Sequence, residues 1–251
     1  MNVTATEMMI CAASRELRDH DSVLVGVGVP NLACNLAKRT HAPNLTMIYE
    51  SGTIDSNPDR LPLSIGDPVL SSTAVNIESM FDGFSYYLQA GHIDVGFLGG
   101  AQIDKRGNIN STVIGEYDDP KVRLPGSGGA CEIAINAGKT IILAPHRKRR
   151  FPESVDFVTS PGYLRDAGDR ERLGIGGGPE AVITDLGVMR FDETGEMYVD
   201  SIHPETTRES IQNETAWDIA FADELRSTPE PDEETVRLIR EDLDPKGMYT
   251  E

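Results

Sequence analysis

Short apolar runs alternate with segments of helical period through the first 150 residues, and this alternation constrains the fold most strongly. Val95–Leu98 and Thr140–Ala144 have the composition of strands that are covered on both faces. Between such runs, residues 7–17 and 30–40 carry apolar side chains at helical spacing. The pattern predicts an α/β fold, with an open, mostly parallel sheet and helices on both faces.

The pattern changes after about residue 156 to strands joined by short turns, which predicts a β-meander toward the C-terminus over residues 181–202. Residues 229–251 then supply a linker and an acidic amphipathic helix that we expect to pack in cis. We expect residues 1–251 to form a single domain, since this length can bury a proper core. Further predicted elements are strands at 22–27, 45–49 and 109–114, helices at 130–136 and 207–213, and a weaker helix at 75–88 that Gly83 interrupts.

The formal net charge is −18, from 41 acidic and 23 basic side chains, and only six of the latter are lysines. Phosphates would be repelled by such a surface, which argues against a nucleic-acid partner. At molar salt the Debye length is only ~3 Å, so the self-repulsion of the fold is screened. The composition therefore suggests a cytoplasm of high salt. We expect a soluble cytoplasmic protein with no membrane partner, because no apolar run approaches the ~20 residues of a membrane span.

The cysteines and histidines have no metal-ligand spacing, so we expect no metal. Gly26-Val27-Gly28 lies between a predicted strand and a predicted helix, which is the context of a dinucleotide-binding loop. Asn31 occupies the third glycine position of that fingerprint, however, which argues against NAD and FAD.

A carboxylate stands at the end of the predicted strand 45–49, where Glu50 is followed by Ser51 and Gly52. Gly52 lets the backbone turn sharply without a Cβ in the way. A carboxylate on a rigid strand end with little bulk beside it suits acid–base or nucleophilic chemistry. The alternative is an ordinary solvated glutamate.

A glycine-rich loop, Gly126-Ser127-Gly128-Gly129, leads directly into the predicted helix at 130–136. Small residues there expose backbone amides at a positive helix end, which suits an anion or a developing oxyanion. Pro125 stands where the elbow of a serine hydrolase needs glycine, which argues against that class. A tight turn with close helix–strand packing would explain the glycines equally well.

The chain resembles the β subunit of family I CoA-transferases, of the glutaconate CoA-transferase type. The resemblance covers nearly the whole chain, from residue 25 to residue 245, and its motifs stand in order. The segments that carry it are Tyr49-Glu50-Ser51-Gly52, FLGGAQID (97–104), GNINST (107–112), PGSGGA (125–130), KRRF (148–151), VTSPG (158–162) and RERLG (170–174).

The resemblance implies a catalytic nucleophile at Glu50, which would carry CoA as a glutamyl thioester. It associates the loop of Gly126, Ser127, Gly128 and Gly129 with the oxyanion and the bound CoA thioester, and it places the turn with Gly26 and Gly28 at the active site. Coenzyme A is then a cosubstrate, and an α subunit is the partner in a hetero-oligomer.

A short dicarboxylic acid is the substrate class that the resemblance suggests. Arg147, Lys148, Arg149 and Arg150 form a basic cluster that is a candidate for CoA phosphates or for a subunit contact, and a solvated basic run is an equal alternative. Two other functions stay open at this point, an acyl-CoA hydrolase of the same superfamily and a non-catalytic supporting subunit. Retention of Glu50 favours transfer over both.

Overall fold

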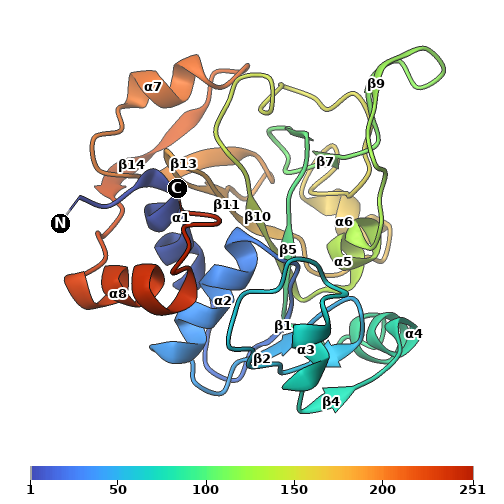
Figure 1. The fold of residues 1–251 in the computed structure, drawn as a ribbon. Coiled ribbons are helices and arrows are strands. Elements are labelled where there is room, and N and C mark those ends of the chain that lie inside the picture. The colour runs from blue at the N-terminus through green and yellow to red at the C-terminus, as the bar shows by residue number, and fades with distance from the viewer. Residues whose placement is uncertain (1, 251) are drawn as a thin grey trace. The chain divides into compact units, whose positions relative to one another are not determined.

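The computed structural model describes residues 2–250, which fall into two compact units (Figure 1). The terminal unit combines the chain up to Phe97 with the chain from Pro229 onward, and the central unit is Leu98–Thr228. The C-terminal linker and helix therefore belong to the same unit as the N-terminal segments. A single domain over residues 1–251 stays a prediction.

The strands of the terminal unit follow the order β5–β1–β2–β3–β4. Three of them are parallel, β1 (Ser22–Leu24), β2 (Thr46–Ile48) and β5 (Val95–Leu98), and they coincide with apolar runs of the sequence. Two short antiparallel strands extend this order, β3 (Thr53–Ile54) and β4 (Asn76–Ile77).

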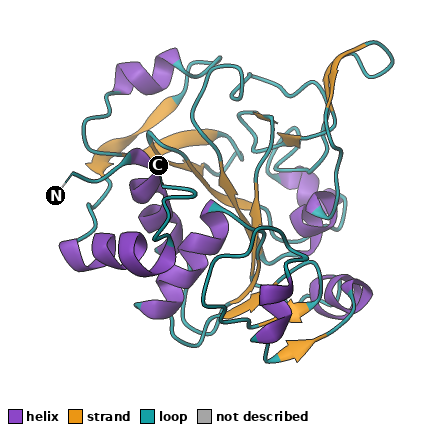
Figure 2. Cartoon of the chain, in the orientation of Figure 1, coloured by secondary structure: helices purple, strands orange, loops and turns teal. Residues whose placement is uncertain are grey.

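Helices from both ends of the chain pack together in the terminal unit (Figure 2), and they bury one hydrophobic cluster. They are α1 (Ala5–Ser14), α2 (Val29–Arg39) and α8 (Glu233–Arg237), which continues as the π-helical segment η2 (Leu238–Leu243). The buried members of the cluster are Ile10, Cys11, Leu32, Leu36, Ile239 and Leu243. Burial raises the pKa of the Cys11 thiol to about 12, so this cysteine is a small apolar member of the cluster.

The terminal unit departs from prediction in the segment 68–88. The helix that we predicted at 75–88 begins only at Met80, because Ser79 and Asp82 form a capping box and residues 76–77 pair with β3. At Gly83 the short helix α4 (Met80–Asp82) passes into the π-helical segment η1 (Gly83–Leu88). The helix α3 (Pro68–Ser72) was not predicted.

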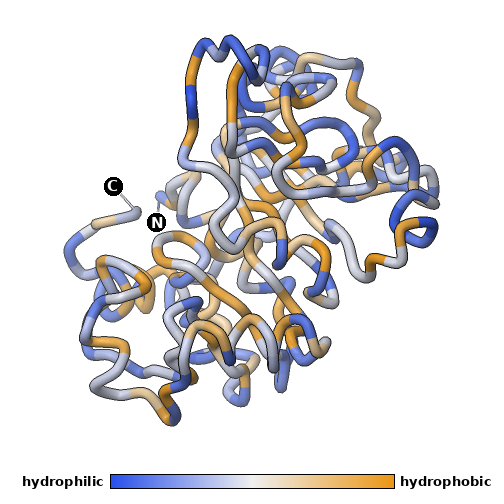
Figure 3. Tube along the Cα trace, turned by 90° about the vertical axis from the view of Figure 1, so that its right-hand side faces the viewer, coloured by the Kyte–Doolittle hydropathy of each residue, from blue (hydrophilic) through white to orange (hydrophobic). Residues whose placement is uncertain are grey.

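The central unit confirms the predicted α/β architecture with a meander toward the C-terminus. Its strands β10 (Lys139–Leu143) and β11 (Pro179–Ile183) are parallel, and β11, β12 (Gly187–Phe191) and β13 (Met197–Ile202) form the antiparallel meander. A strand that we did not predict, β14 (Ala220–Ser227), runs parallel to β13. Along the chain trace, hydrophobic stretches alternate with hydrophilic loops (Figure 3).

The remaining elements of the central unit are short. The strand that we predicted at 109–114 is in fact two, because the Asn110 side chain accepts hydrogen bonds from the amides of Thr112 and Val113 and so turns the chain. The elements are β6 (Gln102–Ile103), β7 (Ile109–Asn110), β8 (Val113–Gly115), β9 (Pro120–Arg123), α5 (Ala130–Asn136), α6 (Gly168–Arg172) and α7 (Arg208–Asn213). Within residues 2–250, no helix has the length and apolar character that crossing a membrane requires.

Candidate active site

Glu50 lies at the tip of the tight turn that joins β2 to β3. The Gly52 amide donates to the Tyr49 carbonyl (2.9 Å), and the Tyr49 amide donates to the Thr53 carbonyl (3.0 Å). The Glu50 side chain is half-buried, and its carboxylate has no hydrogen-bond or ion-pair partner among residues 2–250. Burial alone raises the pKa of this carboxyl above its ordinary value of 4.5. The strand-end carboxylate is therefore unpaired and partly desolvated, which keeps its oxygens available as a base or a nucleophile.

Gly52 is required at its position for two separate reasons. Its φ of +93° is a backbone conformation that L side chains rarely adopt. A Cβ on Gly52 would lie 2.1 Å from the carbonyl oxygen of Glu78, whose amide donates to the Gly52 carbonyl at 2.9 Å. The predicted sharp turn is confirmed, and the structure adds that any side chain here would displace the backbone next to the Glu50 turn.

The glycine turn Gly26–Gly28 emerges from β1 at the same edge as Glu50 emerges from β2. The two strands are parallel, and the Val25 amide continues their ladder by donating to the Ile48 carbonyl (3.0 Å). Gly28, with φ +86°, is the residue from which α2 begins, and Pro30 lies in the first turn of that helix, as predicted. The structure thus brings Glu50 together with Gly26 and Gly28 at one edge of the parallel strands, the usual place for an α/β site.

A buried hydrogen bond links these two turns. The Asn31 side-chain amide on α2 donates to the phenol oxygen of Tyr49 at 2.5 Å, and both residues are buried. Tyr49 immediately precedes Glu50, so the start of α2 holds the carboxylate's own neighbour. Sequence reasoning used Asn31 only as evidence against a dinucleotide, and it missed this contact.

The glycine loop Gly126–Gly129 lies in the central unit. The Gly126 amide donates to the Ser111 carbonyl (2.8 Å), and the Ser111 hydroxyl donates to the Gly126 carbonyl (2.9 Å). The Ser127 hydroxyl donates to the Gly128 carbonyl (3.0 Å). Within the described chain, the amides of Gly128 and Gly129 have no acceptor, and nothing lies within 4 Å of a Cβ built on Gly128. The loop therefore presents two free amide donors beside open space.

The helix that follows this loop is held by a buried arginine. Arg170 is 4% exposed, and its guanidinium donates to the carbonyls of Ala134 on α5 (2.8 Å), Pro161 (3.1 Å) and Gly162 (3.0 Å), and also to Gly176. Four carbonyl dipoles thus replace a carboxylate partner. Sequence reasoning noted the segment RERLG but gave Arg170 no role.

The basic cluster 147–150 divides into two kinds of side chain. Arg147 pairs with Asp185 (2.8 Å), and the Arg150 guanidinium donates to the Gly100 carbonyl. The side chains of Lys148 and Arg149 are exposed and make no ion pair within residues 2–250. Lys148 and Arg149 are therefore the two cluster side chains with neither an ion pair nor a hydrogen bond within the described residues, while Arg147 is exposed but paired.

The central unit thus carries the glycine loop and the basic cluster, while the terminal unit carries Glu50 and the Gly26–Gly28 turn. Among the described residues, no group of three or more histidine, cysteine, aspartate or glutamate side chains is arranged to hold a metal ion.

Comparison with known proteins shows which family the chain resembles. The model of the Coenzyme A transferase family matches residues 6–214. The chain is 45% identical over 239 residues to the B subunit of 3-oxoadipate CoA-transferase from Pseudomonas knackmussii, covering 94% of this chain and 92% of that one. It is 41% identical over 257 residues to the B subunit of glutaconate CoA-transferase from Acidaminococcus fermentans, covering 99% and 95%.

A solved structure is similar along the whole chain. The crystal structure of glutaconate coenzyme A-transferase from Acidaminococcus fermentans superposes with a TM-score of 0.93 and 37% identity, covering all of this chain and 98% of that one.

The burial of Glu50 makes a prediction about stability. We expect Glu50→Gln to raise the free energy of unfolding at neutral pH, because folding opposes ionisation of a carboxyl whose pKa burial has raised. This gain in the free energy of unfolding is present at pH values above the raised pKa of the Glu50 carboxyl in the folded chain. It disappears as the pH falls below 4.5, where the carboxyl is neutral in both the folded and the unfolded chain.

Thermal unfolding of the two proteins across this pH range measures the effect. Glu230→Gln is the matched control, since it makes the same charge change at an exposed site in the same unit. A Glu50→Gln protein that is less stable than wild type at neutral pH would contradict the account.

Proposed function

This chain belongs to the coenzyme A transferase family, as the β subunit of such an enzyme, and we propose that it transfers CoA through a covalent thioester on Glu50. The observation that carries the proposal is the unpaired, half-buried Glu50 carboxylate at the tip of a rigid hairpin. A carboxylate in this state is a better nucleophile than one held in an ion pair.

The proposed chemistry has two exchange steps before the acceptor enters. A Glu50 oxygen attacks the carbonyl carbon of the donor acyl-CoA, the carbon–sulfur bond breaks, and CoA leaves as a thiolate from a mixed anhydride. The thiolate then attacks the Glu50 carbonyl carbon, which releases the donor acid and leaves CoA on Glu50 as a thioester. The acceptor acid runs the same steps in reverse. One thioester is exchanged for another, so no ATP is consumed.

Each attack creates a negatively charged tetrahedral oxygen that needs hydrogen-bond donors. We assign this role to the amides of Gly128 and Gly129. The support for it is that, among residues 2–250, neither amide has an acceptor and no atom lies within 4 Å of a Cβ on Gly128. The loss of one such donor costs about 10²–10³ in rate. The Gly26–Gly28 turn, at the same sheet edge as Glu50, forms a second part of the proposed site.

The substrate class follows from the relatives' names and from charge. Glutaconate and 3-oxoadipate are both dicarboxylates, and we propose a short dicarboxylic acid for this enzyme. An acidic substrate and CoA must approach a chain of net charge −18, so exposed cations are needed. Arg147, Lys148 and Arg149 are the exposed residues of the basic cluster. Lys148 and Arg149 make no ion pair within residues 2–250, and we propose that they contact CoA phosphates or the partner subunit.

We propose an α subunit as the partner, because the two relatives above are each one named subunit of a CoA-transferase. The complex of both chains is then the form in which activity is measured.

Transfer activity of that complex tests the role of Glu50. We expect Glu50→Gln to lower kcat for CoA transfer by at least about 10³-fold, because the amide cannot form the anhydride. Glu230→Gln, an exposed glutamate of the same unit, is expected to keep wild-type activity.

The same assay separates the other functions. Acyl-CoA hydrolysis without transfer would make the protein a hydrolase, and a Glu50→Gln complex as active as wild type would make this chain a supporting subunit. Either result contradicts the proposal.

We also propose that the protein works in a cytoplasm of high salt. The support for this is the excess of acidic side chains, 41 against 23 basic ones. We expect stability to rise with salt concentration, because salt screens the repulsion between carboxylates. Circular dichroism at increasing potassium chloride measures this, and full stability at low ionic strength would contradict it.

A further inference from the structure

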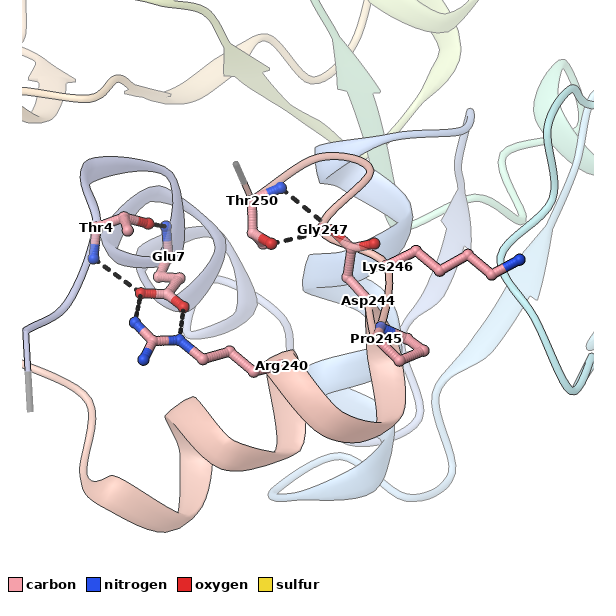
Figure 4. Close-up of a pocket in the computed structure, with 8 residues that line it drawn as sticks. All are labelled: Thr4, Glu7, Arg240, Asp244, Pro245, Lys246, Gly247 and Thr250. Carbon is pink, nitrogen blue, oxygen red and sulfur yellow. Dashed lines mark hydrogen bonds and ion pairs between the residues drawn. The ribbon is translucent and has the colours of Figure 1, made fainter.

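The C-terminal tail, Asp244–Thr250, folds back and is held by a single carboxylate. The buried Asp244 side chain accepts hydrogen bonds from the amides of Met248 (2.8 Å), Tyr249 (2.9 Å) and Thr250 (3.1 Å), and from the Thr250 hydroxyl (3.1 Å). Figure 4 shows the carboxylate directed at Thr250 across this loop. Three consecutive amides bound to one carboxylate give the tail a defined conformation.

This tail places an aromatic ring against the Gly26–Gly28 turn. Tyr249 is half-buried and packs on the hydrophobic cluster of α1, α2 and η2. Its Cε1 and Cδ1 atoms lie 3.6 Å and 3.8 Å from the position that a Cβ on Gly28 would occupy. The ring therefore borders the space beside the α carbon of Gly28, at the distance where a side-chain carbon would be in van der Waals contact with it.

Apart from the hydrogen bond between Asn31 and Tyr49, which holds the start of α2, the turn has few other constraints. Backbone hydrogen bonds hold it at its two ends, from the Val25 amide to the Ile48 carbonyl and from the Leu32 amide to the Gly28 carbonyl. Among residues 2–250, no side chain caps the start of α2 by a hydrogen bond, and no atom lies within 4 Å of a Cβ on Gly26. Glycines at such a turn have many accessible backbone conformations. An aromatic ring on one side of the turn excludes the conformations in which the backbone would move into it.

We propose that Tyr249 is a positioning residue, which holds the Gly26–Gly28 turn in its active geometry by closing the space beside Gly28. The inference rests on the proposed function, because it gives that turn a part in CoA transfer. Loss of the ring frees Gly28 from its φ of +86° and lets the turn move relative to Glu50. Small displacements of site groups lower the rate of chemistry more than they weaken substrate binding.

The test compares Tyr249→Ala with Tyr249→Phe and Leu238→Ala in the complex with the α subunit. Leu238 packs against the same hydrophobic cluster, but within the described chain only Tyr249 has atoms within 4 Å of the position of a Cβ on Gly28. Leu238→Ala therefore removes similar packing without touching the turn. We expect kcat to fall about tenfold in Tyr249→Ala with KM changed less than twofold, and to stay within twofold of wild type in both other variants.

Amide hydrogen exchange in the isolated subunit reads the same contact without any activity. We expect residues 26–29 to exchange faster in Tyr249→Ala than in wild type, and at the wild-type rate in Tyr249→Phe and Leu238→Ala.

A Tyr249→Ala complex with wild-type kcat, or a Leu238→Ala complex with an equal loss of kcat, would overturn the inference. A wild-type complex that transfers no CoA would instead contradict the proposed function, while the exchange measurement would still decide whether Tyr249 holds the turn.

Discussion

The parallel register of β1 against β2 is the constraint on which the arrangement around Glu50 depends. Val23 pairs with Met47 and Leu24 with Ile48, so both strands end at the same level. The Gly26–Gly28 turn and the Glu50 turn consequently leave the sheet at one edge. The buried hydrogen bond from Asn31 to Tyr49 then fixes the start of α2 to the residue before Glu50. A shift of this register would separate the carboxylate from the turn and leave Tyr49 without its donor.

The groups that we assign to chemistry are ones that the folded chain leaves unsatisfied or in an uncommon conformation. Glu50 is partly desolvated without a partner, the amides of Gly128 and Gly129 lack acceptors within the described chain, and Gly28 has a conformation that few residues adopt. Well-satisfied contacts surround each of them, including the Asn31–Tyr49 pair, the Arg170 carbonyl contacts and the Asp244 loop. Local conflicts supported by a consistent surrounding structure are typical of functional sites.

Sequence patterns predicted the features that depend on neighbouring residues. The apolar runs located β1, β2, β5 and β10, and the order Glu50-Ser51-Gly52 predicted a carboxylate at a sharp turn. Contacts between distant segments have no such local signal. Tyr249 meets Gly28 from the opposite end of the chain, and Asn31 meets Tyr49 through strand pairing. The break between β7 and β8 was missed because a single asparagine side chain, Asn110, overrides an apolar run.

The covalent thioester on Glu50 is the central claim, and reductive trapping tests it most directly. The complex with the α subunit is incubated with an acyl-CoA, treated with borohydride and digested, and the peptide that contains Glu50 is examined by mass spectrometry. A thioester is reduced to a primary alcohol, so the account predicts a Glu50 side chain converted to the alcohol only when acyl-CoA is present. An unmodified Glu50 in a complex that has turned over its acyl-CoA would contradict it.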